Sequence, residues 1–116
     1  MAFALKRVYE EPREEDGTRV LVERLWPRGV SRERARLDLW LKDVAPSTGL
    51  RRWYGHDEAL WEEFRRRYFR ELEAHPEAVA TLREAGRRGP VTLVYAARAG
   101  ERCGAAALKE FLERGG

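Results

Sequence analysis

The sequence predicts an α/β domain in which a small, mostly parallel β-sheet is layered with helices, and it predicts a single domain over residues 1–116. Two observations indicate this class. Apolar, strand-like runs lie near both ends of the chain, with amphipathic helical patterns between them. The chain then closes with a strand, a short loop and a helix, which is the unit from which layered parallel sheets are built.

Three segments have the short apolar pattern of buried strands, namely residues 3–9, 19–25 and 90–96. The third, PVTLVYA, is apolar almost throughout, as expected for an inner strand of a covered sheet. A proline and an Asp-Gly pair between residues 10 and 18 indicate a loop. Residues 37–44 alternate apolar and charged side chains, so we expect an extended segment there.

The clearest helix is predicted over residues 57–74, where large apolar side chains recur at spacings of three and four and form one face: Leu60, Trp61, Phe64, Tyr68 and Leu72. Ser31 and Ser47 are predicted N-caps of two shorter helices. Pro76 suits the first position of a further helix, and Gly86 is its predicted C-terminal cap. The final helix is expected over residues 105–116.

Composition narrows the function classes. The 23 Lys and Arg residues nearly balance 20 Asp and Glu, without a long tail of one sign, so nucleic-acid binding is permitted but not indicated. The lack of Asn, Gln and Ile fits a heat-adapted source or GC-rich coding.

Cys103 is the single cysteine, which excludes an internal disulfide, and no Cys–His pair has zinc spacing, so neither a metal nor another cofactor is expected. No apolar run has the length of a leader or a membrane span, which predicts a cytoplasmic protein that does not contact a membrane.

The stretch RLWPRG follows the second predicted strand and places an indole between two arginines. Arg24 and Arg28 carry forked donors that suit phosphate or carboxylate, and Trp26 would stack on a flat ligand. The structural alternative is that Trp26 belongs to the core while the arginines pair with local acids such as Glu23 or Glu33. Ligands collect at the carboxyl ends of parallel strands, which is where this stretch is expected.

The stretch YAARAGERCG leads from the last predicted strand into the last helix. This arrangement makes an anion-binding cradle, to which Arg98 and Arg102 would add charge. Cys103 would lie near the positive end of the helix, where a thiolate is stabilised, or would simply be a small buried residue. The loop also resembles the rhodanese-type loop, in which a nucleophilic cysteine follows the strand. Ala97 aligns with that nucleophile, so sulfur transfer by that route is not expected.

His56 follows a glycine in the stretch GHD and is a candidate general base or anion ligand, although a loop histidine is commonly just polar surface. Asp57 beside it is the expected cap of the long helix. Arg51 and Arg52 precede this stretch, in the same constellation, and a solvated face is the alternative interpretation for them. In RRRYFR, the helical spacing turns Tyr68 toward the core, so its arginines are expected to pair with neighbouring acids rather than with nucleic acid.

Taken together, RLWPRG, WLKDVAPS, GHD followed by WEEFRRRY, and the final strand VTLVYAAR resemble the family known as domain of unknown function 488, in its YeaO-like branch. The resemblance covers nearly the whole chain. It implies a single-domain bacterial or archaeal cytoplasmic α/β protein and leaves the reaction open. The chain departs from the family pattern in two ways. Arg102 and Cys103 stand where similar family members carry a loop His and Asn. More distant members carry CHR at this place, and here Cys103 is followed by Gly104 and Ala105 instead of His and Arg.

The function that the sequence favours is binding of, or action on, a small phosphate- or carboxylate-bearing ligand. Arg24, Trp26, Arg28, Arg98 and Arg102 are the predicted ligand-binding residues, and the candidates for catalysis are His56 and Cys103. A nucleic-acid-associated module and a protein-interaction module without catalysis are the alternatives. An oligomer is compatible with the sequence.

Overall fold

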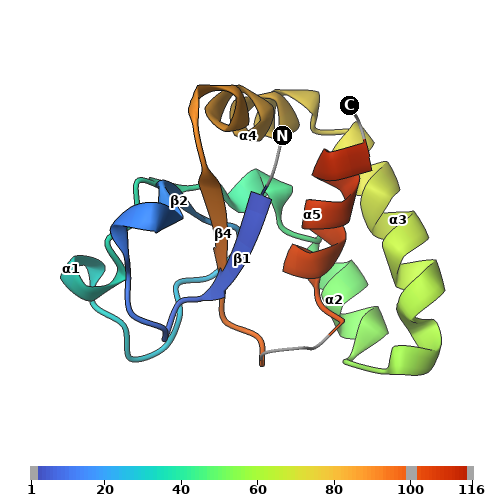
Figure 1. Ribbon diagram of the computed structural model, residues 1–116. Helices are drawn as coiled ribbons and strands as arrows, with labels where there is room; N and C mark the ends of the chain where they lie inside the picture. The colour runs from blue at the N-terminus through green and yellow to red at the C-terminus, as the bar shows by residue number, and fades with distance from the viewer. Residues whose placement is uncertain (1–2, 99–101, 115–116) are drawn as a thin grey trace.

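The computed structural model describes residues 3–98 and 102–114 and confirms the α/β class. A sheet of four parallel strands has the order β1-β4-β2-β3. The strands are β1 (Phe3–Arg7), β2 (Thr18–Leu21), β3 (Leu39–Trp40) and β4 (Val91–Tyr95). The last strand, β4, is an inner strand that pairs with the edge strand β1 on one side and with β2 on the other (Figure 1).

The helices are α1 (Arg32–Ala35), α2 (Thr48–Tyr54), α3 (Trp61–Glu73), α4 (Pro76–Arg88) and α5 (Gly104–Arg114). Figure 1 shows α2, α3 and α5 stacked on one side of the sheet and α1 on the other. Helix α4 crosses the end of the sheet at which β4 begins. Among the described residues, no helix is long and apolar enough to cross a membrane.

Alternation along β4 divides the apolar residues between the two faces of the sheet. Val91, Leu93 and Tyr95 join the main core with α2 to α5, whereas Val94 belongs to a smaller cluster on the α1 side. The apolar face of α3 contributes to the main core as its periodicity predicts, since Phe64, Tyr68 and Leu72 are all buried there.

Two predicted extended segments are shorter than the sequence indicates. β2 ends at Leu21 rather than at residue 25, although the Val22 N–H still donates to the Val94 carbonyl at 3.1 Å. In the segment 37–44, the pairing with β2 covers Leu39–Trp40 alone, and a 3₁₀ turn follows at Lys42–Val44. Val22, Leu41 and Val44 continue these apolar runs beyond the paired residues because their side chains pack in the main core, which a sequence pattern cannot distinguish from strand pairing.

Two helix boundaries also differ from the prediction. Residues 57–74 begin with a separate 3₁₀ turn, Glu58–Leu60, which Asp57 caps by accepting the Ala59 N–H at 3.0 Å; α3 begins only at Trp61. Gly86 does not end α4, which continues to Arg88. Its cap is Gly89, and Pro90 follows, which suits the end of a helix because proline cannot continue it. Ser31, Ser47 and Pro76 have the predicted roles.

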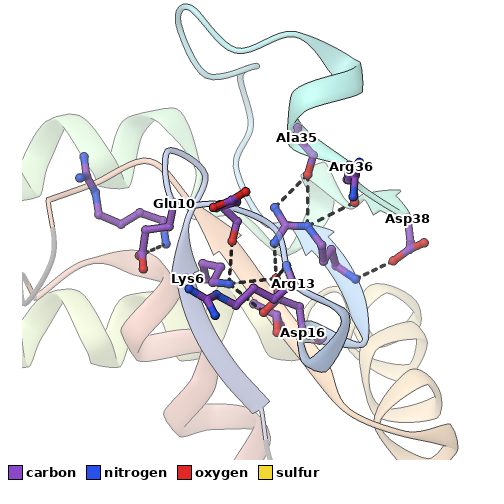
Figure 2. A network of polar contacts seen from close by, with 11 residues as sticks. Lys6, Glu10, Arg13, Asp16, Ala35, Arg36 and Asp38 are labelled. Carbon is purple, nitrogen blue, oxygen red and sulfur yellow. Dashed lines mark hydrogen bonds and ion pairs between the residues drawn. The ribbon is translucent and has the colours of Figure 1, made fainter.

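The α1 side of the sheet also carries a buried polar network, shown in Figure 2. The Asp16 carboxylate, 7% exposed, accepts hydrogen bonds from Lys6 at 2.9 Å and from Arg19 at 2.6 Å. Arg19, 4% exposed, also donates to the carbonyls of Ala35 at 2.8 Å and Arg36 at 3.2 Å. The network therefore ties the end of α1 to the start of β2.

Candidate functional site

A cavity of about 620 Å³ opens at the edge of the sheet where β2 and β4 end. Its wall includes Arg24 from RLWPRG, His56 from GHD, and Ala97 and Cys103 from the two ends of the loop after β4. Figure 1 shows α2 and the first turn of α5 beside this end of β4. The structure thus brings together, in one concave site, parts of all three stretches that the sequence singled out.

Arg24 is a half-buried member of this wall that also connects two loops. Its Nε donates to the Pro46 carbonyl at 3.3 Å and its Nη2 donates to the Ala45 carbonyl at 3.1 Å. A guanidinium has five N–H donors, so these two bonds fix its position and use only part of its capacity. Arg24 is therefore both a structural tie and a cation at the cavity.

Helix α2 adds Arg51 and Arg52, both exposed, to the cavity wall. The helix is held by its cap, because the Ser47 N–H and hydroxyl donate to the Glu71 carboxylate at 2.8 and 2.6 Å. The same Ser47 hydroxyl accepts the Leu50 N–H at 3.2 Å. Glu71 of α3 thus orients α2, and with it the two arginines.

His56 lines the cavity directly after α2. Gly55 and His56 have consecutive positive φ values of 52° and 61°. The left-handed conformation costs a non-glycine residue about 1–2 kcal/mol, so the surrounding structure must hold His56 there. Its ring lies 6.4 Å from the ring of buried Tyr54, at an angle of 45°. The turn thereby places an imidazole at the rim, beside an aromatic wall.

Cys103 is half-buried and directly precedes α5, where its carbonyl accepts the Ala107 N–H at 3.1 Å. Gly104 and Ala105, the first residues of α5, also line the cavity. Unpaired backbone N–H groups in the first turn of a helix favour negative charge. The cavity is therefore bordered by a helix end of positive polarity as well as by arginines.

Glu23 is the acidic residue among the described residues of the cavity wall. Its backbone carbonyl accepts the Trp40 Nε1–H at 2.7 Å. Burial raises the pKa of the Glu23 carboxyl, while the Arg51 charge and a backbone hydrogen bond from Ala96 lower it by less, so the pKa lies above its usual value.

Sequence reasoning considered Glu23 only as a pairing partner of the arginines and gave a solvated face as the alternative interpretation for Arg51. Their shared place in the site depends on how α2 docks, which sequence spacing does not encode.

Trp26 and Arg28 lie apart from this cavity wall. Trp26 is half-buried on the α1 side of the sheet, where its Nε1–H donates to the Val30 carbonyl at 2.6 Å and its ring meets that of Trp40 at 5.5 Å. The Arg28 side chain is exposed, and its backbone carbonyl accepts the Tyr9 hydroxyl at 3.3 Å. The structure therefore separates these two residues from Arg24, although all three belong to RLWPRG.

Arg98 and Arg102 are both exposed and flank residues 99–101, which lie outside the described part of the chain. The Arg102 carbonyl accepts the Tyr54 hydroxyl at 2.8 Å, which ties the start of α5 to α2. Neither arginine belongs to the described cavity wall, whereas Ala97 and Cys103, which neighbour them in sequence, do.

Three arginines of RRRYFR on α3, namely Arg65, Arg66 and Arg67, pair with neighbouring acids, as the solvated-face interpretation predicts. Arg65 bonds Glu62 at 3.1 Å, and the Glu63 carboxylate receives Arg66 at 2.8 Å and Arg67 at 2.9 Å. Within the described ranges, no group of three or more His, Cys, Asp and Glu side chains is arranged to hold a metal ion. The cationic character of the cavity therefore comes from Arg24, Arg51 and Arg52 and not from the arginines of α3.

Comparison with known proteins places the chain among relatives of similar length. A family model described as "Inactive DUF488-N3 subclade" matches residues 2–115. The uncharacterized protein Rv3073c of Mycobacterium tuberculosis (strain ATCC 25618 / H37Rv) is 45% identical over 106 residues, which cover 91% of this chain and 89% of that protein. The uncharacterized protein YeaO of Escherichia coli (strain K12) is 38% identical over 98 residues, 84% of this chain and 85% of YeaO. No solved structure gives a significant match.

Proposed function

Given that the chain belongs to the inactive DUF488-N3 subclade, we propose that it is a cytoplasmic binding protein whose cavity holds a small phosphate- or carboxylate-bearing ligand without converting it. The observation that carries this proposal is the charge of the cavity wall. Arg24, Arg51 and Arg52 line it together with His56 and the first turn of α5, against the single acid Glu23 among the described lining residues.

The dimensions and the walls of the cavity support a ligand with an organic body. A volume of about 620 Å³ falls within the range of about 300–1,000 Å³ typical of small-molecule sites. Apolar side chains complete the wall, among them Val22, Tyr54 and Phe64. Such walls exclude water from one side of a ligand while the arginines meet its anionic group.

Binding without conversion is favoured by the residues at the places where chemistry would be expected. Ala97, which aligns with the nucleophile of rhodanese-type loops, lines the cavity and offers no reactive atom. Arg102 and Cys103 stand at the places where similar members of the family are expected to carry a loop His and Asn. The description of the subclade as inactive agrees with this substitution pattern. His56 and Cys103 line the cavity, and in this proposal they contact the ligand without reacting with it.

The proposal is tested by titrating inorganic phosphate, sulfate and adenosine monophosphate into the wild type, Arg51→Ala and Arg28→Ala. Arg51 is exposed at the cavity, so its removal should leave the fold intact and weaken binding about tenfold, the worth of one charge-assisted hydrogen bond. Arg28→Ala is the matched control, because it removes an exposed arginine of RLWPRG that lies outside the cavity wall. Equal binding by the wild type and Arg51→Ala, or a loss confined to Arg28→Ala, would overturn the cavity proposal.

The alternative of a nucleic-acid or protein-interaction module stays a prediction. The nucleic-acid module is tested by titrating duplex and single-stranded oligonucleotides across a range of salt concentrations. Binding that falls steeply with salt and is unaffected by Arg51→Ala would favour the nucleic-acid module over the cavity proposal.

A further inference from the structure

The carboxyl group of Glu23 gives this cationic cavity a second, opposite character. Glu23 follows the end of β2, where Val22 is hydrogen-bonded to Val94 and where the Glu23 carbonyl holds Trp40. The backbone on either side is therefore fixed by the neighbouring strands. The side chain it carries lines the cavity beside Arg24 and within the electrostatic reach of Arg51.

Among the described residues, the Glu23 carboxyl has partners that only partly offset its burial. Burial raises its pKa by more than Arg51 and the Ala96 backbone together lower it. A carboxylate that was fully paired would have a lowered pKa, as Asp16 has in its contacts with Lys6 and Arg19. A carboxylate has about four acceptor sites, of which the Ala96 N–H uses one. The neighbouring Arg24 guanidinium donates to the Pro46 and Ala45 carbonyls instead, so Glu23 has further capacity to accept a hydrogen bond within the cavity.

Resting on the proposed function, we propose that Glu23 selects among anions for those that carry a hydroxyl or ammonium donor beside the anionic group. The anionic group meets the arginines of α2 and the first turn of α5, and the donor meets the Glu23 carboxylate. An anion without such a donor leaves the carboxylate desolvated and facing a like charge, which costs binding free energy. The ligand class is therefore an amphoteric or hydroxylated small anion.

Three probes of nearly equal size separate this selection from simple charge attraction: ethyl phosphate, 2-hydroxyethyl phosphate and 2-aminoethyl phosphate. A purely cationic cavity should bind the aminoethyl probe least tightly, because its ammonium is repelled by the arginines. A Glu23 contact reverses that order. We expect the wild type to bind 2-aminoethyl phosphate about tenfold more tightly than ethyl phosphate, with 2-hydroxyethyl phosphate between them.

The variant Glu23→Gln keeps the size of the side chain and removes its charge. It should weaken the binding of 2-aminoethyl phosphate and strengthen the binding of ethyl phosphate. The variant should then bind 2-aminoethyl phosphate no more tightly than ethyl phosphate. Glu77→Gln is the matched control, since Glu77 is exposed on α4 and far from the cavity wall in the described structure. Thermal unfolding of both variants verifies that they are folded. A Glu23→Gln variant that fails to fold is replaced by Glu23→Ala, for which the same loss of preference is expected.

The outcomes separate this inference from the proposed function. If the wild type binds all three phosphates, Arg51→Ala weakens them, and ethyl phosphate binds at least as tightly as 2-aminoethyl phosphate, the role of Glu23 is overturned while the anion site stands. If the donor preference is present but survives Glu23→Gln, another residue provides it and the inference is equally overturned. If none of the probes binds the wild type, the anion site itself is refuted and the inference falls with it.

Discussion

Gly104 shows how a single residue shapes the cavity. A Cβ at this position would lie 3.1 Å from Cδ of Pro46 and 2.8 Å from its Cγ, and the second distance is shorter than real Cβ contacts. The Pro46 ring is stiff, and its carbonyl holds Arg24. The absence of a side chain at Gly104 therefore lets the first turn of α5 contact the loop that positions a cavity arginine.

We predict that Gly104→Ala lowers the free energy of unfolding by about 1–2 kcal/mol, because the contact with Pro46 must open and overpacking outweighs the gain in helix propensity. Gly49→Ala is the control. Gly49 lies in α2 with open space around its Cβ direction, so this change should raise the free energy of unfolding by about 0.5–1 kcal/mol. Urea denaturation measures both. A stabilised Gly104→Ala protein would contradict the close contact.

At the scale of elements, the Asp16 network decides how α1 is attached to the sheet. Burial acts to raise the pKa of Asp16, but hydrogen bonds from Lys6, the Arg13 backbone and Arg19 together outweigh it, and the pKa is lowered. A carboxyl group whose pKa is lower in the folded state than in the unfolded state stabilises the fold above its unfolded pKa. That stability is lost as the pH falls through the folded pKa.

We predict that Asp16→Asn costs about 3 kcal/mol at pH 7, because it leaves the buried Arg19 guanidinium without its charged partner. The difference from the wild type should shrink as the pH falls below about 4, the usual pKa of Asp, and through the lower pKa of the folded state, because the wild-type carboxyl then becomes protonated as well. Denaturation curves at several pH values measure this. Glu14→Gln, which changes an exposed acid in the same turn, should have little effect. A pH-independent cost of Asp16→Asn would contradict the ionic account.

The sequence predicted elements well where local pattern and tertiary packing agree. The apolar run of β4 and the spacing of Phe64, Tyr68 and Leu72 are examples, since both serve the main core. Prediction failed where apolar residues serve another purpose. Val22 and Leu25 extend the apolar run of β2, yet Val22 lines the cavity and Leu25 is 73% exposed at its rim. The run alone does not reveal which of its residues pair with a neighbouring strand.

At the scale of the whole molecule, the cavity that we propose as the ligand site lies at the carboxyl ends of β2 and β4, the end of the sheet that the sequence analysis favoured. Arg24, His56 and Cys103 line this cavity. Trp26 lies on the other side of the sheet, because the turn after β2 carries it into the smaller cluster with Trp40. Arg51 and Glu23 could not be assigned from sequence, since the Ser47–Glu71 contact that orients α2 joins residues far apart in the chain.

Because β2, β4, α2 and α5 all contribute to the cavity, a bound anion should stabilise the whole fold and not one loop. A ligand that binds only the folded state at ten times its Kd adds about 1.4 kcal/mol, which corresponds to a Tm increase of about 6 °C for a chain of this size. We predict this increase for the wild type with the tightest-binding anion of the titrations.

Phosphate and sulfate also stabilise proteins in general, by exclusion from their surface. Arg51→Ala at the same anion concentration controls for that effect and should show at most about a third of the increase, because a tenfold higher Kd leaves its cavity only half occupied. Equal increases in the two proteins would mean that the anion acts as a general salt and that the cavity does not bind it.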